Sequence, residues 1–206
     1  MPASRNSWAF LLASGAGIAI FLGGASKAYA AVTKSVKARG MLKNNIPIVL
    51  MIVKHWASTF PNVPIKLVMS IIGNESGFNA NATNLTGGDL VRGGAWGLGQ
   101  ITLSTATGIP PLIPGSVKGG PVYKHWTGNG KDLLDPSLNV LFMMAYLNYL
   151  LKELSNDSVL ATAAYNRGLG SVKKMVAQGR QNDIAQLDYV KHVQASGESL
   201  TKEGIV

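Results

Sequence analysis

The chain has 206 residues, enough for one domain of ordinary size plus an appendage. It contains no cysteine, which excludes disulfides and thiolate metal sites. Its formal net charge is +9, but residues 1–74 carry eight Lys and Arg and no acid, whereas residues 75–206 carry eleven bases against ten acids. The nearly neutral C-terminal part argues against a nucleic-acid partner, and the basic N-terminal part favours a membrane or an anionic polymer as its neighbour.

An uncharged apolar run occupies residues 8–25. As a helix, its eighteen residues would span ~27 Å, close to the hydrocarbon thickness of a bilayer. A basic stretch over residues 27–43 follows it. We therefore predict two parts: an apolar membrane-associating helix plus a basic segment over residues 1–42, and a folded domain over residues 43–206.

Helical patterns dominate from residue 45 onward. Residues 46–58 are predicted to form an apolar-rich helix, and residues 64–74 a second helix with proline at its first position. Glycines indicate a loop or short hairpin over residues 79–94. A further helix is predicted from about residue 96 to residue 106.

Four prolines and six glycines indicate a long irregular loop over residues 108–131. Asp135 then supplies an N-cap, and Pro136 opens a helix that runs to about Leu154 and is apolar on nearly all sides, as at the centre of a domain. Asp157 caps the next helix. With further helices near residues 170–178 and 187–202 and no convincing β-alternation, periodicity predicts a mainly α domain.

Glu75 is the first acidic residue of the chain and directly follows the helix over residues 64–74. The negative pole of that helix disfavours a carboxylate at its C-terminal end, and apolar neighbours such as Ile71 and Ile72 disfavour it further. Both effects favour the protonated form that a general acid needs. The alternative is a solvated glutamate in a loop.

Further segments of the sequence support the interpretation of Glu75 as an acid catalyst. Residues 74–80 read Asn-Glu-Ser-Gly-Phe-Asn-Ala, residues 94–102 read Gly-Ala-Trp-Gly-Leu-Gly-Gln-Ile-Thr, residues 163–168 read Ala-Ala-Tyr-Asn-Arg-Gly, and a late tyrosine stands at Tyr189. In this order they resemble the lytic transglycosylase domain of bacteria and their phages, which carries Glu-Ser-x-Phe, Gly-Leu-Met-Gln, Ala-Tyr-Asn and a late Tyr. The resemblance covers roughly residues 43–195 and implies a mainly α, lysozyme-like fold.

The resemblance also implies peptidoglycan glycan strands as the substrate and Glu75 as the catalytic residue. Glu75 would first act as the acid on the MurNAc-GlcNAc β-1,4 bond and then as the base toward the substrate's own 6-hydroxyl, giving 1,6-anhydro-muramoyl ends. The substrate acetamide replaces the second carboxylate that most glycosidases use. No cofactor or metal is implied, and the three histidines lack the spacing of metal ligands.

Five residues match substrate-binding positions of the resemblance. Ser76 positions a substrate group or the catalytic loop, or only bonds its own helix backbone. Gln100 binds a substrate acetamide, or holds the segment around Glu75 to its helix. Tyr165 and Asn166 form a groove wall and the hydrogen bond that orders it, or Tyr165 is a plain core residue. Tyr189 places its hydroxyl near the acid, or packs on the surface.

The chain also departs from the pattern of the family. The family's methionine in the second segment is Gly99 here, which is expected to leave room where that side chain would line the groove. Residues 86–94 read as an insertion and are a candidate flap. Phe78, Trp96 and Trp126 are candidates for stacking on sugar faces, or are core aromatics.

The apolar segment has three interpretations. A cleaved export signal would use Ala28-Tyr29-Ala30 as its cleavage site. A transmembrane anchor fits the length, but the basic residues after it would keep the domain in the cytoplasm, away from peptidoglycan. Delivery in a virion removes this conflict, so we predict a phage virion protein that digests the wall during genome entry and contacts the membrane through residues 8–25.

Copies of the same chain or other virion proteins are expected as its partners. Three alternatives stay open. The first is an exported or membrane-anchored periplasmic enzyme of the bacterium. The second is a hydrolytic muramidase. The third is an ejection-channel protein whose lysozyme-like module has weak or no activity.

Overall fold

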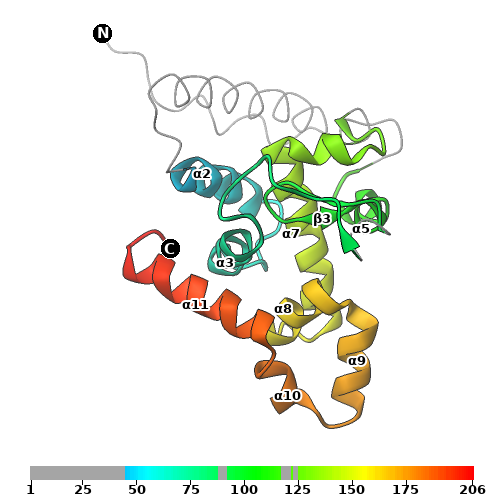
Figure 1. The fold of residues 1–206 in the computed structure, drawn as a ribbon, viewed down its shortest axis with the longest axis vertical. Coiled ribbons are helices and arrows are strands. Elements are labelled where there is room, and N and C mark those ends of the chain that lie inside the picture. The colour runs from blue at the N-terminus through cyan, green and yellow to red at the C-terminus, as the bar shows by residue number, and fades with distance from the viewer. Residues whose placement is uncertain (1–44, 88–91, 117–121, 123–124) are drawn as a thin grey trace.

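The structure, a computed structural model, describes residues 45–87, 92–116, 122 and 125–206 (Figure 1). The apolar helix predicted over residues 8–25, and with it the membrane-associating part over residues 1–42, lies outside the described residues. Across the part that the structure describes, no helix is both long and apolar enough to cross a membrane.

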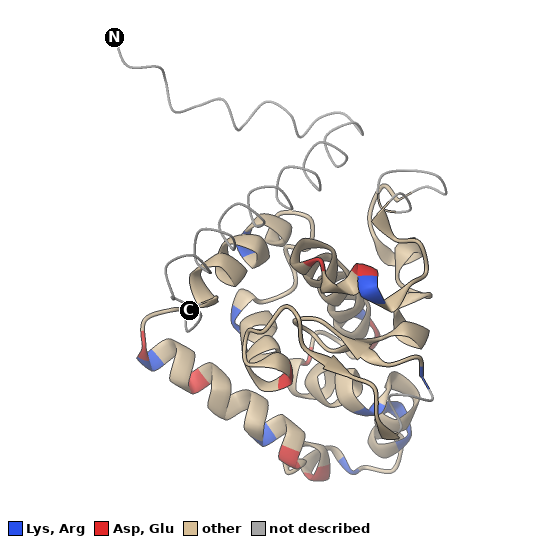
Figure 2. Cartoon of the chain, turned by 45° about the horizontal axis from the view of Figure 1, so that its top comes forward, with Lys and Arg blue, Asp and Glu red and all other residues tan. Residues whose placement is uncertain are grey.

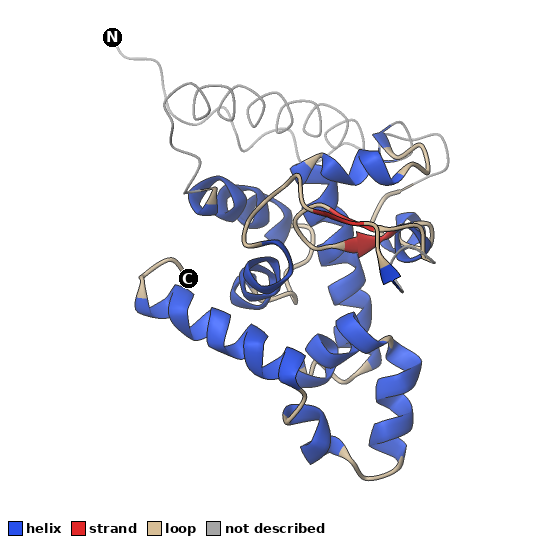
Figure 3. Ribbon diagram, viewed as in Figure 1, coloured by secondary structure: helices blue, strands red, loops and turns tan. Residues whose placement is uncertain are grey.

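The described residues form a mainly helical domain with one small antiparallel sheet (Figure 3). This confirms the mainly α part of the predicted fold class, whereas the apolar N-terminal helix of that prediction lies outside the described residues. The helices are α2 (Ile46–Ala57), α3 (Ile65–Ser76), α5 (Leu103–Ala106), η1 (Pro110–Leu112), η2 (Gly130–Leu134), α7 (Pro136–Glu153), α8 (Ser158–Arg167), α9 (Leu169–Ala177), α10 (Gln181–Ala185) and α11 (Asp188–Lys202), and the strands are β1 (Thr83–Asn84), β2 (Ala95–Trp96) and β3 (Ile101–Thr102).

Helix α7 is the centre of the domain, with α2 and α8 packed against it (Figure 1). The Asp135 carboxylate accepts hydrogen bonds from the backbone N–H groups of Ser137 and Leu138, and Pro136 takes the first turn, as the sequence predicts. Every residue from Pro136 to Ala145 is buried, so the first half of this helix is enclosed on all sides. The Asp157 cap of α8 is also present.

The helix predicted from residue 96 is wrong, because most of that segment turns and pairs as strands. The chain enters β2, turns through Gly97, and returns in β3, so that only α5 is helical. Gly97 has φ +72°, and a Cβ there would lie 2.2 Å from the backbone oxygen of Leu133. Only glycine fits a turn that is both left-handed and pressed against a neighbouring backbone.

The C-terminal helix α11 packs across α3 (Figure 1). Their approach is close because glycines stand at the contact: a Cβ on Gly73 would lie 2.6 Å from the Ser196 Oγ, and a Cβ on Gly197 would lie 2.5 Å from the Ser70 Oγ. Acidic and basic positions alternate along α11 (Figure 2), in keeping with the balanced charge of residues 75–206. This packing brings the start of α11 to the end of α3.

Candidate active site

Glu75 lies in the last turn of α3 and is half-buried. The helix ends just after it because Gly77 adopts a left-handed conformation with φ 56°, and Phe78 follows with φ 65°. The carboxylate therefore projects from a rigid helix whose inner face, including Ile71 and Ile72, is fully buried.

Tyr189, in the first turn of α11, donates a hydrogen bond to Glu75 Oε1 at 2.5 Å. The two residues stand 114 positions apart in the chain and meet because α11 crosses α3. Burial, and secondarily the negative charge of Glu75, raise the pKa of the Tyr189 phenol well above its usual value. The phenol therefore stays protonated at neutral pH and remains a hydrogen-bond donor to the carboxylate.

Tyr165, on α8, donates a hydrogen bond to the backbone oxygen of Gly99 at 2.8 Å. Its ring is half-buried. Burial raises the pKa of its phenol well above the usual value, and the nearby charge of Glu75 raises it further. This bond thus joins residues 163–168 to residues 94–102, on the same side of the domain as Glu75.

Gln100 uses both hydrogens of its amide to hold backbone. Its Nε2 donates to the carbonyl oxygens of Ala82, at 3.1 Å, and Gly97, at 2.9 Å, which joins the chain before β1 to the turn after β2. The segment that it fixes is therefore this turn, whereas the sequence had suggested the helix of Glu75. Its amide oxygen makes no hydrogen bond to another residue within the described ranges.

A residue that the sequence analysis did not select organises the same turn. Asn139, fully buried in α7, accepts a hydrogen bond from the Gly99 N–H and donates to the carbonyl oxygens of Trp96 and Leu133, each at 2.8 Å. Both amide hydrogens and the amide oxygen are engaged. The available signal was a polar residue within the otherwise apolar run of the central helix.

The expectation that Gly99 leaves room in the groove is wrong. A Cβ on this residue would lie 2.8 Å from the Tyr165 hydroxyl oxygen and 3.1 Å from the Met143 sulfur. The space beside Gly99 is thus already filled by side chains of α8 and α7. A larger residue would have to displace the phenol that bonds this backbone.

Ser76 and Asn166 make no contact with Glu75 in the hydrogen bonds of the described residues. The Ser76 hydroxyl donates to the backbone oxygen of Ile72 at 3.2 Å, which is the alternative that the sequence left open. Asn166 is exposed at the end of α8, and its side chain makes no hydrogen bond to another described residue.

All three aromatic candidates for sugar stacking belong to the core or its edge. Trp126 is buried, and its ring centroid lies 5.3 Å from that of Phe142. Phe78 is half-buried and packs against the core. Trp96 is also half-buried, and its indole N–H donates to the backbone oxygen of Gly93 at 3.0 Å.

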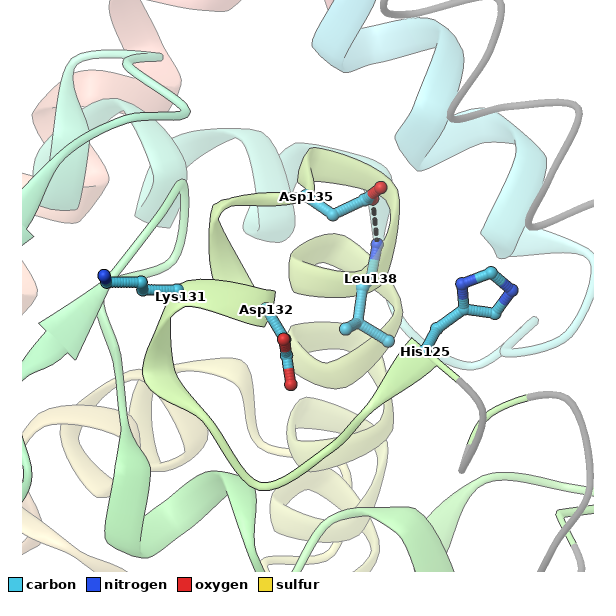
Figure 4. Close-up of a pocket in the computed structure, with 5 residues that line it drawn as sticks. All are labelled: His125, Lys131, Asp132, Asp135 and Leu138. Carbon is cyan, nitrogen blue, oxygen red and sulfur yellow. Dashed lines mark hydrogen bonds between the residues drawn. The ribbon is translucent and has the colours of Figure 1, made fainter.

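A separate cavity of about 220 Å³ lies at the start of α7, lined by His125, Lys131, Asp132, Asp135 and Leu138 (Figure 4). Both of its carboxylates are already bonded to backbone: Asp132 accepts from the Thr127 N–H at 2.8 Å, and Asp135 caps α7 by accepting from the Leu138 N–H at 2.9 Å. Within the described ranges, no three His, Asp or Glu side chains form a group that could hold a metal ion.

Comparison with known proteins points to one family. The model for the Transglycosylase SLT domain matches residues 53–187. The soluble lytic murein transglycosylase of Escherichia coli (strain K12) is 29% identical over 142 residues, covering 68% of this chain and 19% of that protein. The soluble lytic murein transglycosylase of Salmonella typhimurium is 31% identical over 134 residues, covering 65% of this chain and 18% of that protein.

A solved structure has a similar fold. It is the complex of the 70-kDa soluble lytic transglycosylase with bulgecin A, which aligns with a TM-score of 0.56 and 25% sequence identity over 89% of this chain and 29% of that chain. The chain spans about a fifth of the length of the curated relatives that it matches.

Proposed function

Because the chain belongs to the Transglycosylase SLT domain family, we propose that it is a peptidoglycan lytic transglycosylase. It cleaves the MurNAc-GlcNAc β-1,4 bond and leaves 1,6-anhydro-muramoyl ends. The observation that carries the proposal is the hydrogen bond from the Tyr189 hydroxyl to the half-buried carboxylate of Glu75. The bond from Tyr165 to the Gly99 backbone adds a second residue of the sequence pattern to the same site.

The reaction needs one carboxylate in two roles. Protonated Glu75 transfers its proton to the glycosidic oxygen, the bond from that oxygen to the muramoyl anomeric carbon breaks, and the GlcNAc unit leaves with its new hydroxyl. The substrate acetamide oxygen stabilises the positive charge at the anomeric carbon. The Glu75 carboxylate then removes the proton of the substrate's 6-hydroxyl, whose oxygen bonds the anomeric carbon and closes the anhydro ring.

Tyr189 assists when Glu75 has given up its proton, because a phenol hydrogen bond stabilises the charged carboxylate more than the neutral acid. It also fixes the orientation of the carboxyl group between the two proton transfers. Tyr165 acts indirectly, by holding the backbone at Gly99 through its hydroxyl.

The remaining substrate contacts follow from the positions of the polar groups. The Gln100 amide oxygen accepts the N–H of a substrate acetamide, while its own N–H groups hold the turn in place. Ser76 and Asn166 contact the glycan strand from the end of α3 and the end of α8, respectively.

The product of digestion tests the proposal. Peptidoglycan treated with the full chain should yield muropeptides lighter by one water than the hydrolysed forms, as measured by mass spectrometry. The Glu75→Gln variant serves as the control for contaminating activity. Products of hydrolytic mass would make the protein a muramidase, and the absence of any product from the folded protein would leave a wall-binding module.

We also propose that the protein acts in the bacterial envelope after delivery in a virion, and that residues 8–25 associate with the membrane there. The uncharged run of these residues and the basic stretch over residues 27–43 support this. Flotation of the full chain with anionic liposomes tests membrane association. Loss of flotation in a variant with charges introduced into residues 8–25 is expected. Cleavage after Ala30 in the mature protein would instead identify an export signal.

A further inference from the structure

A row of tyrosine rings continues from Tyr165 along α7. The ring centroids of Tyr165 and Tyr146 lie 5.7 Å apart at an interplanar angle of 50°, and those of Tyr146 and Tyr149 lie 6.5 Å apart at 23°. Tyr146 and Tyr149 are three residues apart on one helix, so they share a face. The row therefore extends the aromatic surface near the acid by two rings.

The exposure of these rings differs from that of core aromatics. Phe142, on the same helix, is fully buried, whereas Tyr146, Tyr149 and Tyr165 are each half-buried. The hydroxyls of Tyr146 and Tyr149 make no hydrogen bond to any other described residue. Burial, followed by the proximity of Tyr149, raises the pKa of the Tyr146 phenol, so it is neutral and can donate. A phenol that is partly buried normally has a polar partner.

Charged groups stand at the far end of the row. Lys173, on α9, donates a hydrogen bond to Glu153 at 2.5 Å, and Glu153 lies four residues after Tyr149, on the same side of α7. The pKa of Lys173 is raised mainly by its bond to Glu153 and to a lesser degree by Tyr149. An aromatic ring, a cation and a carboxylate thus meet at one partly exposed place.

We infer that Tyr149, together with Lys173 and Glu153, forms a carbohydrate subsite remote from the bond that Glu75 cleaves. It holds a distal amino-sugar residue of the glycan strand: the C–H face of the sugar packs on the ring, and its hydroxyl and acetamide groups bond the phenol and the ion pair. The inference rests on the proposed function, because it assumes that a glycan strand runs from Glu75 along the row.

Binding to uncut strands tests the subsite. The full chain carrying Glu75→Gln is titrated calorimetrically with peptide-free glycan strands of graded length, from one disaccharide upward. Adding Tyr149→Leu, which keeps an apolar side chain of moderate size, should weaken binding of long strands about tenfold, the loss expected for one aromatic contact. The affinity for a single disaccharide should change less than twofold, because one disaccharide fills the cleavage site alone.

Matched variants separate the subsite from a general effect on the fold. Tyr149→Phe keeps the ring and should retain most of the affinity for long strands. Lys173→Ala should weaken the binding of long strands only. Lys152→Ala, at an exposed lysine in the same turn of α7, is the control and should bind like the parent. Circular dichroism shows whether Tyr149→Leu still folds; if it does not, the length dependence of Lys173→Ala decides.

Equal affinities of the parent and Tyr149→Leu for long strands would overturn the subsite, as would an equal loss at every length. The outcome is separable from that of the proposed function. If the wild-type chain cuts no peptidoglycan but the length-dependent loss is found, the subsite stands and the cleavage assignment fails. If the wild-type chain cuts peptidoglycan and no length dependence appears, only the subsite fails.

Discussion

Replacing Asn139 by leucine should destabilise the domain strongly. The substitution keeps the approximate volume of the side chain but removes three hydrogen bonds of 2.8 Å, so the Gly99 N–H and the carbonyls of Trp96 and Leu133 lose their side-chain partner. Each buried unsatisfied group costs about 1–3 kcal/mol. Relaxation and entry of water recover part of this, so the expected loss is about 3–5 kcal/mol.

A loss of that size is a large share of the about 5–15 kcal/mol that stabilises a typical domain. It is measured as the shift in midpoint of urea unfolding at unchanged slope, followed by far-UV circular dichroism. Asn148→Leu is the matched control: it makes the same change on the same helix, at a half-buried residue whose side chain makes no hydrogen bond to another described residue. We expect the control to cost under about 1 kcal/mol.

The loss of the Asn139 amide should also lower activity. At a temperature where Asn139→Leu is still folded, peptidoglycan cleavage should fall, because the turn that carries Gly99 and Gln100 loses its anchor on α7. A stability within about 1 kcal/mol of the wild type, or an equal loss in the Asn148→Leu control, would refute the role of the buried amide.

Three further predictions follow from the site and its turn. Glu75→Gln should reduce wall lysis in zymograms by about 10²–10⁴-fold with an unchanged helical signal, since it removes the only acid of the Asn-Glu-Ser-Gly-Phe segment; near-wild-type lysis would contradict the assignment. Gly97→Ala should lower the free energy of unfolding by about 2–4 kcal/mol, because the new Cβ would lie 2.2 Å from a backbone oxygen. Gly128→Ala, also at positive φ but with open space around it, is the control and should lower it by about 1 kcal/mol in the same urea unfolding experiments. Stability should fall as pH rises above about 10, because the unfolded chain releases the phenol protons of Tyr165 and Tyr189 there while the folded chain retains them; a midpoint of urea unfolding that stays constant from pH 9 to about pH 11 would count against this.

The sequence predicted the long helices well because their ends depend on local chemistry. Asp135 and Pro136 start α7 and Asp157 starts α8 at the predicted residues, since a cap needs only its own following turn. The small helix α10 was not predicted, because it has five residues and no capping side chain. Short elements of this kind depend on the helices around them.

The turn after β2 could not be predicted from its own residues. Its course depends on a bond from Asn139, which stands 40 positions after Gly99, and on the backbone of Leu133 beside Gly97. A position near Glu75 was one of two interpretations that the resemblance left open for Tyr189, and the close packing of α11 on α3 that produces the contact became visible only in the structure. The interpretation of Gly99 failed for the same reason: the neighbours that fill its space lie on α7 and α8.

The crossing of α3 by α11 determines when, during synthesis, the hydrogen bond between Tyr189 and Glu75 can form. Glu75 emerges early from the ribosome, but its phenol partner follows 114 residues later, in the last long helix of the domain. A nascent chain, or one cut before α11, possesses the carboxylate without the donor that orients it. Because Gly73 and Gly197 allow the two helices to approach, the bond from Tyr189 to Glu75 depends on the completed helix packing rather than on any local segment.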